Sequence, residues 1–115
     1  MAIDIFKTVD IIELMDNYLE KVRPPLNIRK QLDLGYIIER QSVILTEIRP
    51  GRLNPEQYRD LPYAKASFIK SKNIWKIYWM RGNLNWYLYN PVPEVSTLNE
   101  FLTIVDEDAF HCFKG

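Results

Sequence analysis

The chain has few of the residues from which cross-links and many active sites are built. It has one cysteine, Cys112, which excludes an intrachain disulfide, and one histidine, His111, which excludes a histidine-based metal cluster. Its four glycines form no phosphate-cradling loop. No apolar run approaches the roughly 18 residues that a membrane-spanning helix needs. We therefore expect no cofactor, no metal site and no membrane insertion.

Charge is balanced overall but unevenly distributed. The formal net charge is zero, so global charge indicates no polyanionic partner. Both ends of the chain are acidic, whereas the stretch 61–93 has only basic charged residues: Lys65, Lys70, Lys72, Lys76 and Arg81. Two interpretations stay open. Either acidic terminal helices neutralise a basic sheet by docking beside it, or the sheet presents a basic binding face.

The start of the chain shows no secretion signal, because residues 1–7 lack a basic stretch followed by an apolar core. Together with the single thiol, this favours a reducing compartment, and we expect a cytoplasmic protein. A length of 115 residues is typical of one domain, which we assign to 1–115, with 1–7 as a flexible arm.

Apolar residues at helical spacing predict a helix at each end of the chain. The first is expected over about residues 9–21, capped by Asp10 with Glu13 or by Thr8, and the second begins at the capping box Thr97–Glu100. Their buried stripes are Ile11, Leu14, Met15, Tyr18, Leu19 and Val22, and Leu98, Phe101, Leu102 and Val105. Three acids follow at 106–108, and either Asp108 caps a further turn or they meet basic residues elsewhere.

Between the helices, the pattern predicts a short helix at 26–32, closed by Gly35, and then strands. A first hairpin is expected at 36–39 and 42–49 around Arg40-Gln41; its apolar residues lie on both faces, which indicates cover on two sides or a central position. Residues 52–61 read as a polar loop, either functional or mobile. The next strand, 63–70, is expected to place Ala64, Ala66 and Phe68 on the face that carries the tryptophans.

The aromatic stretch 73–90 predicts a hairpin with a two-residue type II′ turn at Gly82-Asn83. That turn pairs Trp79 with Trp86 and Ile77 with Leu88, and it places all three tryptophans on one face, which we expect to be buried. The fold class is therefore α+β, an antiparallel sheet of about five strands, a hairpin plus a three-stranded meander, with both terminal helices on one face.

Several segments of the chain resemble a known family. They are LDLGY at 32–36, EIRP at 47–50, AKA at 64–66, WKIYW at 75–79, VDED at 105–108 and FKG at 113–115. In this combination they resemble the DUF3024 family of small bacterial proteins of unknown function, over about residues 10–115. The resemblance implies an identity and no activity.

The predicted pairing leaves the second face of the sheet with interleaved lysines and tyrosines: Lys65, Lys76, Tyr78, Tyr87 and Tyr89. Flat rings among lysines suit single-stranded nucleic acid, because bases stack on rings and lysines meet phosphates. The leading hypothesis is therefore a non-enzymatic binding module for single-stranded nucleic acid or a protein partner. It is a monomer or a homodimer joined through an edge strand. The alternative is a metal-dependent phosphodiesterase that needs Glu47 and Lys65 on one face.

Overall fold

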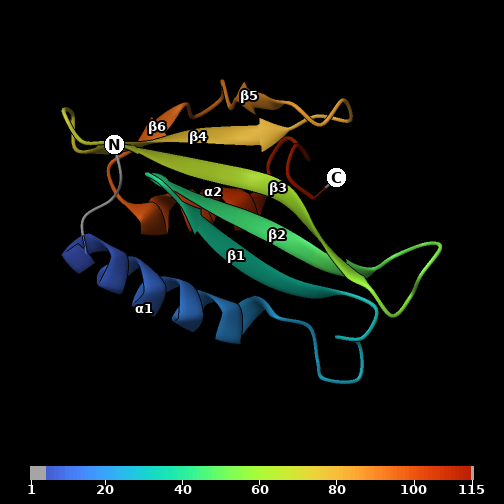
Figure 1. Cartoon of the computed structure of the whole chain (residues 1–115). Coiled ribbons are helices and arrows are strands. Elements are labelled where there is room, and N and C mark those ends of the chain that lie inside the picture. The colour runs from blue at the N-terminus through green and yellow to red at the C-terminus, as the bar shows by residue number, and fades with distance from the viewer. Residues whose placement is uncertain (1–4, 115) are drawn as a thin grey trace.

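Alternating apolar residues in the middle of the chain build an antiparallel sheet, and two amphipathic helices cover one of its faces (Figure 1). The computed structural model describes residues 5–114. This confirms the α+β class with helices near both ends. The elements are α1 (Ile5–Val22), β1 (Asp33–Glu39), β2 (Ser42–Pro50), β3 (Tyr58–Ile69), β4 (Ile74–Met80), β5 (Trp86–Leu88), β6 (Glu94–Val95) and α2 (Leu98–Glu107).

The strands follow one another across the sheet in the order β1-β2-β3-β4-β5, and β6 pairs with β4 beside β5. The first hairpin has the predicted two-residue turn, since Glu39 pairs with Ser42 and Arg40 takes a left-handed φ of 56°. The β3–β4 turn has four residues, because Ile69 pairs with Ile74. Because the number of turn residues is even, Ala64, Ala66 and Phe68 of β3 lie on the same face as Trp75 and Trp79, as predicted.

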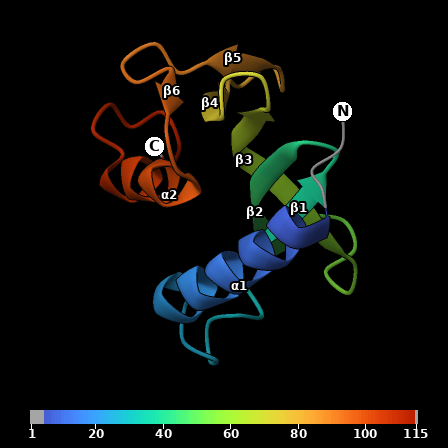
Figure 2. The same cartoon turned by 90° about the vertical axis from the view of Figure 1, so that its left-hand side faces the viewer.

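The core lies between the sheet and the two helices. Ala64 and Ala66 are fully buried in β3, opposite Trp79 and Ile77 of β4. Small side chains at the centre of the sheet leave room for large ones from the helices. The buried set also contains Ile11, Met15 and Tyr18 of α1 and Leu98, Phe101, Leu102 and Val105 of α2. Both predicted stripes are therefore core, and Figure 2 shows both helices on the same side of the strands.

Helix α1 begins earlier than the sequence pattern indicated. It starts at Ile5, so neither Asp10 nor Thr8 is its N-cap, and residues 5–7 do not belong to an arm. Residues 5–10 contain no proline or glycine, so nothing in them stops the helix at residue 9. Residues 1–4 of the expected arm lie outside the described residues.

A hydrogen bond between side chains links the two helices. The hydroxyl of Tyr18 in α1 donates to Oδ1 of Asp106 in α2 over 2.6 Å. Burial, followed by this bond, raises the pKa of Tyr18, so the hydroxyl stays protonated as a donor. Asp106 also lies 3.8 Å from Nζ of Lys114. One of the three terminal acids therefore meets a basic residue, as the second interpretation required.

The other interpretation holds for Asp108. This residue ends α2 with a left-handed φ of 42°, and its carboxylate accepts the backbone N–H groups of Phe113 and Lys114 at 3.0 and 2.9 Å. The predicted Thr97–Glu100 box is also present at the other end of the helix. Asp108 thereby holds the C-terminal turn against the sheet, where the ring of Phe113 lies 4.8 Å from that of Tyr89.

The prediction of a short helix at 26–32 is wrong. The segment forms successive turns, in which the N–H of Ile28 donates to Pro25 and that of Gln31 to Ile28. Leu26 is 77% exposed, and a helix this short is not stable without burial of an apolar face. Gly35 does not close a helix but lies in β1 opposite Thr46.

The predicted loop 52–61 is also too long, because β3 starts at Tyr58 and pairs with β2 as far as Pro50. The strand pattern was hidden by a β-bulge at which Leu45 pairs with Ala64 but Thr46 pairs with Pro62. The extra residue, Tyr63, breaks the alternation, and Pro62 lies where a missing donor is tolerated. The β2–β3 hairpin is therefore longer than expected.

The β4–β5 register differs from the prediction by one residue. Met80 pairs with Trp86 and Trp79 with Tyr87, so the loop comprises residues 82–84 and not Gly82-Asn83 alone. Leu84 ends it with a φ of 66° and donates its N–H to Arg81. A turn followed by a left-handed residue is the usual three-residue hairpin loop. This shift moves every side chain of β5 to the opposite face.

The loop gives a direct test of this register. A type II′ turn needs a positive φ at Gly82, whereas here the φ of Gly82 lies outside that region and an added Cβ meets nothing within 4 Å. We expect Gly82→Ala to change the free energy of unfolding by less than about 0.5 kcal/mol. Leu84→Asn should be neutral or stabilising, since Asn tolerates this backbone conformation and Leu84 is 75% exposed. A loss above about 1 kcal/mol in Gly82→Ala, measured by urea denaturation, would favour the two-residue turn.

The tryptophans provide a second test, since the register separates them. Trp75 is 3% exposed in the core, whereas Trp86 is half-buried on the opposite face. Trp75→Ala should destabilise by about 3–5 kcal/mol, as large aromatic deletions in cores do. Trp86→Ala should cost about 1–2 kcal/mol. Denaturation followed by circular dichroism avoids the lost fluorescence, and equal losses in the two variants would contradict the assignment of faces.

Candidate functional site

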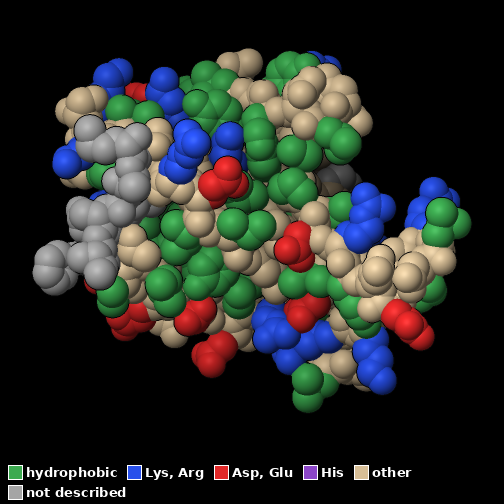
Figure 3. Space-filling model, viewed as in Figure 1, with side chains coloured by type: hydrophobic (Ala, Val, Ile, Leu, Met, Phe, Trp, Pro, Cys, Tyr) green, Lys and Arg blue, Asp and Glu red, His purple; other side chains and the backbone are tan. Residues whose placement is uncertain are grey.

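The side of the sheet away from the helices carries the candidate site. The strand pairing sets three of its residues in a row across three strands, Ile44, Lys65 and Tyr78, with Leu88 next in β5. We call this the open face, formed by Ile37, Ile44, Lys65, Lys76, Tyr78, Trp86 and Leu88. In Figure 1, α2 lies behind the sheet, and Figure 3 has the same view. It shows hydrophobic side chains across the middle of the molecule, with basic and acidic ones above them.

A lysine between two aromatic rings is the centre of the open face. Nζ of Lys65 lies 5.0 Å from the ring centroid of Tyr78 and 4.8 Å from that of Trp86. A cation at this distance is attracted by the electron-rich faces of the rings. Burial lowers the pKa of Lys65, and the charge of Glu39 opposes that shift. Lys65 is therefore a partly desolvated cation held by rings rather than by a carboxylate contact.

Lys76 lies one row along the sheet. It pairs with Ser67 of β3 on one side and with Glu94 of β6 on the other. The hydroxyls of Ser67 and Ser42 share a hydrogen bond of 2.7 Å. Through Ser42 the row continues to Glu39 of β1. It therefore adds one base, two acids and a pair of hydroxyls beside the Lys65 row, so the open face is mixed in charge and not purely basic.

Two of the residues predicted for this face are elsewhere, because of the one-residue register shift. Tyr87 pairs with Trp79 and lies on the helix side, where the guanidinium of Arg81 is 4.7 Å from its ring. Its hydroxyl accepts a hydrogen bond from Asn83. Tyr89 is only 2% exposed and packs on Phe113. Neither ring is therefore available to a ligand on the open face.

The sequence interpretation missed Trp86, which takes the place that Tyr87 was expected to fill. It was placed in the core because a two-residue turn pairs it with Trp79. Tyr89 is the signal that could have found it. Tyr89 directly precedes the apolar stretch Pro91–Pro93, whereas Trp86 follows a polar loop, so Tyr89 is the better candidate for the core. Because side chains alternate along a strand, a buried Tyr89 puts Trp86 on the opposite face.

The arrangement required for phosphodiester cleavage is not present in the described residues. Lys65 pairs with Ile44, and Glu47 is three positions further along β2, so the two side chains point to opposite faces. Glu47 instead accepts a hydrogen bond from Arg49 at 3.1 Å. Within residues 5–114, no group of three or more His, Cys, Asp or Glu side chains is placed to hold a metal ion.

The single thiol lies near the C-terminal turn. Burial, with a contribution from Asp108, raises the pKa of Cys112, which keeps the thiol protonated. Its Sγ lies 3.8 Å from the carbonyl oxygen of Phe110. These surroundings are those of a structural cysteine.

The environment of Lys65 predicts an unusual titration. Because burial disfavours the ammonium form, Lys65 should lose its proton at a lower pH than is usual for a lysine. Glu39→Gln should lower this pKa further, since the Glu39 carboxylate favours the charged form. Glu94→Gln is the control, because Glu94 pairs with Lys76 instead. The side-chain carbon shifts of lysine, followed by NMR from pH 7 to 11, report each value. A Lys65 midpoint at or above the usual lysine value would contradict the partly desolvated position of Lys65 between Tyr78 and Trp86.

The comparisons with known proteins agree with the sequence motifs. The family model of the domain of unknown function DUF3024 matches residues 3–115, essentially the whole chain. No curated protein and no solved structure gives a significant match. In the part of the chain that the structure describes, neither helix is both long and apolar enough to cross a membrane. The chain belongs to the DUF3024 family.

Proposed function

We propose that this member of the DUF3024 family is a non-enzymatic binding module that takes a short single-stranded nucleic acid on the open face of its sheet. The observation that carries the proposal is the cluster of Trp86, Tyr78 and Lys65, in which two rings lie within 5.0 Å of one ammonium group. Stacking of a base on either ring contributes about 1–3 kcal/mol of binding free energy, and the ammonium group of Lys65 can contact the adjoining phosphate.

The geometry supports a small and weak site. Among the side chains that the structure describes, Tyr78 and Trp86 are the aromatic rings on this face, so about two bases can stack. Lys76 gives a second contact for the backbone, but Glu39 and Glu94 lie in the same row and repel phosphates. Weak binding of this kind depends strongly on salt, because released counterions supply much of its free energy.

The nuclease alternative is not carried forward, because it needed Glu47 beside Lys65. The cytoplasmic location expected from the lone cysteine stays a prediction that accords with this proposal, since the cytoplasm contains single-stranded RNA. Pairing through β1, whose outer edge has no partner strand among the described residues, is the corresponding route to a homodimer.

The proposal is tested by fluorescence anisotropy with a labelled six-nucleotide single strand at low salt. The wild type should bind, and the affinity should fall as salt rises. Trp86→Ala and Lys65→Ala should each weaken binding about tenfold, which corresponds to about 1.4 kcal/mol. Both variants are expected to stay folded, because neither side chain belongs to the buried core.

Tyr78→Ala and Tyr87→Ala form a matched pair for the same assay. The two tyrosines are both half-buried on paired strands, but they lie on opposite sides of the sheet. Only Tyr78→Ala should lose affinity. If the wild type does not bind at low salt, or if the two variants lose affinity equally, nucleic-acid binding by the open face is refuted. Capture of an apolar peptide by Ile37 and Leu88 would then be the function to test.

A further inference from the structure

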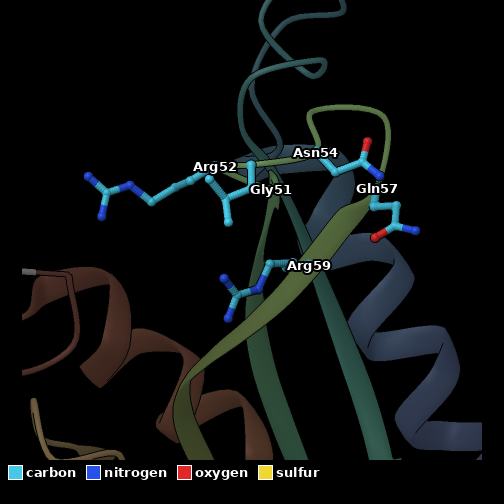
Figure 4. Close-up of a pocket in the computed structure, with 6 residues that line it drawn as sticks. Gly51, Arg52, Asn54, Gln57 and Arg59 are labelled. Carbon is cyan, nitrogen blue, oxygen red and sulfur yellow. The ribbon is translucent and has the colours of Figure 1, made fainter.

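The long β2–β3 hairpin projects beyond both helices (Figure 1). The residues at its tip line a pocket that is open to solvent. The pocket has a volume of about 720 Å³ and is lined by Gly51, Arg52, Leu53, Asn54, Gln57 and Arg59. Figure 4 shows Arg52 and Arg59 reaching out on the same side of the hairpin, with Asn54 and Gln57 on the loop. Two arginines therefore border one hollow.

The loop that carries these residues is closed by its own backbone. The N–H of Gly51 donates to the carbonyl of Gln57 at 2.8 Å, and the N–H of Gln57 donates to that of Asn54 at 3.0 Å. A Cβ on Gly51 would lie 2.9 Å from the carbonyl oxygen of Asn54, so a larger residue cannot occupy this position without a shift. These contacts fix the backbone of the loop before any ligand binds, which lowers the entropic cost of binding.

The charges of Arg52 and Arg59 are not neutralised. Within residues 5–114, neither guanidinium forms an ion pair or a hydrogen bond, whereas Arg23 pairs with Asp33 and Arg49 with Glu47. The two acids of the segment 52–60, Glu56 and Asp60, do not line the pocket. Two guanidinium groups around an open hollow leave an excess of donors that fit phosphate or carboxylate oxygens.

We propose that this pocket binds a small organic phosphate monoester, with the phosphate held by Arg52 and Arg59. Two positive charges match a dianionic phosphate better than a single carboxylate. The volume is far larger than a phosphate needs and falls in the usual range of small-molecule sites. Leu53, which is fully exposed, and the aliphatic stems of the arginines offer apolar surface to the organic part of the ligand.

This pocket is separate from the open face. Arg59 pairs with Arg49, which alternates with Leu45 on the helix side of β2, while Lys65 faces the other way. The inference therefore does not rest on the nucleic-acid proposal.

Isothermal titration calorimetry of the full chain with adenosine monophosphate at low salt tests the pocket. Wild type should bind, and Arg52→Gln with Arg59→Gln should weaken binding at least tenfold. Arg59→Lys should also bind more weakly, because an ammonium cannot make the two-pronged contact of a guanidinium. Inorganic phosphate should compete, but with lower affinity than the nucleotide.

A control with the same loss of charge is Arg40→Gln with Lys72→Gln, at two turns remote from the pocket. Circular dichroism should give the native spectrum for both double variants. The proposal is overturned if the wild type does not bind the nucleotide at millimolar concentration. It is also overturned if the control loses as much affinity as the arginine variant, or if inorganic phosphate binds as tightly as the nucleotide.

Discussion

The alternation of side chains along β3 determines both surfaces of this sheet. Ala64 and Ala66 point toward the helices, whereas Lys65 and Ser67 point away, and β3 is paired on both edges. A slip by one residue would drive Lys65 into the core and leave its charge without a partner, at a cost of several kcal/mol. The same alternation places the small side chains of Ala64 and Ala66 on the helix side, which leaves room for Phe101 and Met15 of the helices to pack there. The cation on the open face is therefore a direct consequence of how the core is packed.

The features that sequence alone predicted correctly are those decided by neighbours or by burial of one face. Thr97 and Glu100 cap α2 because their groups are three residues apart, and Arg40-Gln41 turns because two strands of matching pattern flank it. The face on which Ala64 lies was predicted correctly, because small residues pack well beneath large rings. Of the predicted site, Lys65, Lys76 and Tyr78 are on the open face, because β3 and β4 were aligned correctly.

The features that were missed depend on contacts distant in sequence. Gly82-Asn83 is compatible with both a two-residue and a three-residue loop, and local chemistry does not choose between them. The choice is made by Tyr89, which gains burial against Phe113 only in the observed register. Phe113 is in turn held by the carboxylate of Asp108, which no strand pattern reveals. The bulge at Tyr63 is similar, since its ring is packed against the core although it breaks the alternation. Trp86 and the Arg52–Arg59 pocket were missed for these two reasons.

The contacts of two basic residues, Lys65 and Arg81, bear on the two interpretations of the acidic ends. Among residues 5–114, no ion pair joins a base of the stretch 61–93 to an acid of either helix. Lys65 lies over Tyr78 and Trp86, and Arg81 lies over Trp79 and Tyr87. A ring stabilises a cation without cancelling its charge, whereas a carboxylate neutralises it. Among the described residues, the helices therefore supply no carboxylate contact to Lys65 or Arg81. Aromatic rings, and not helix carboxylates, therefore position these two cations, Lys65 on the open face and Arg81 on the helix side.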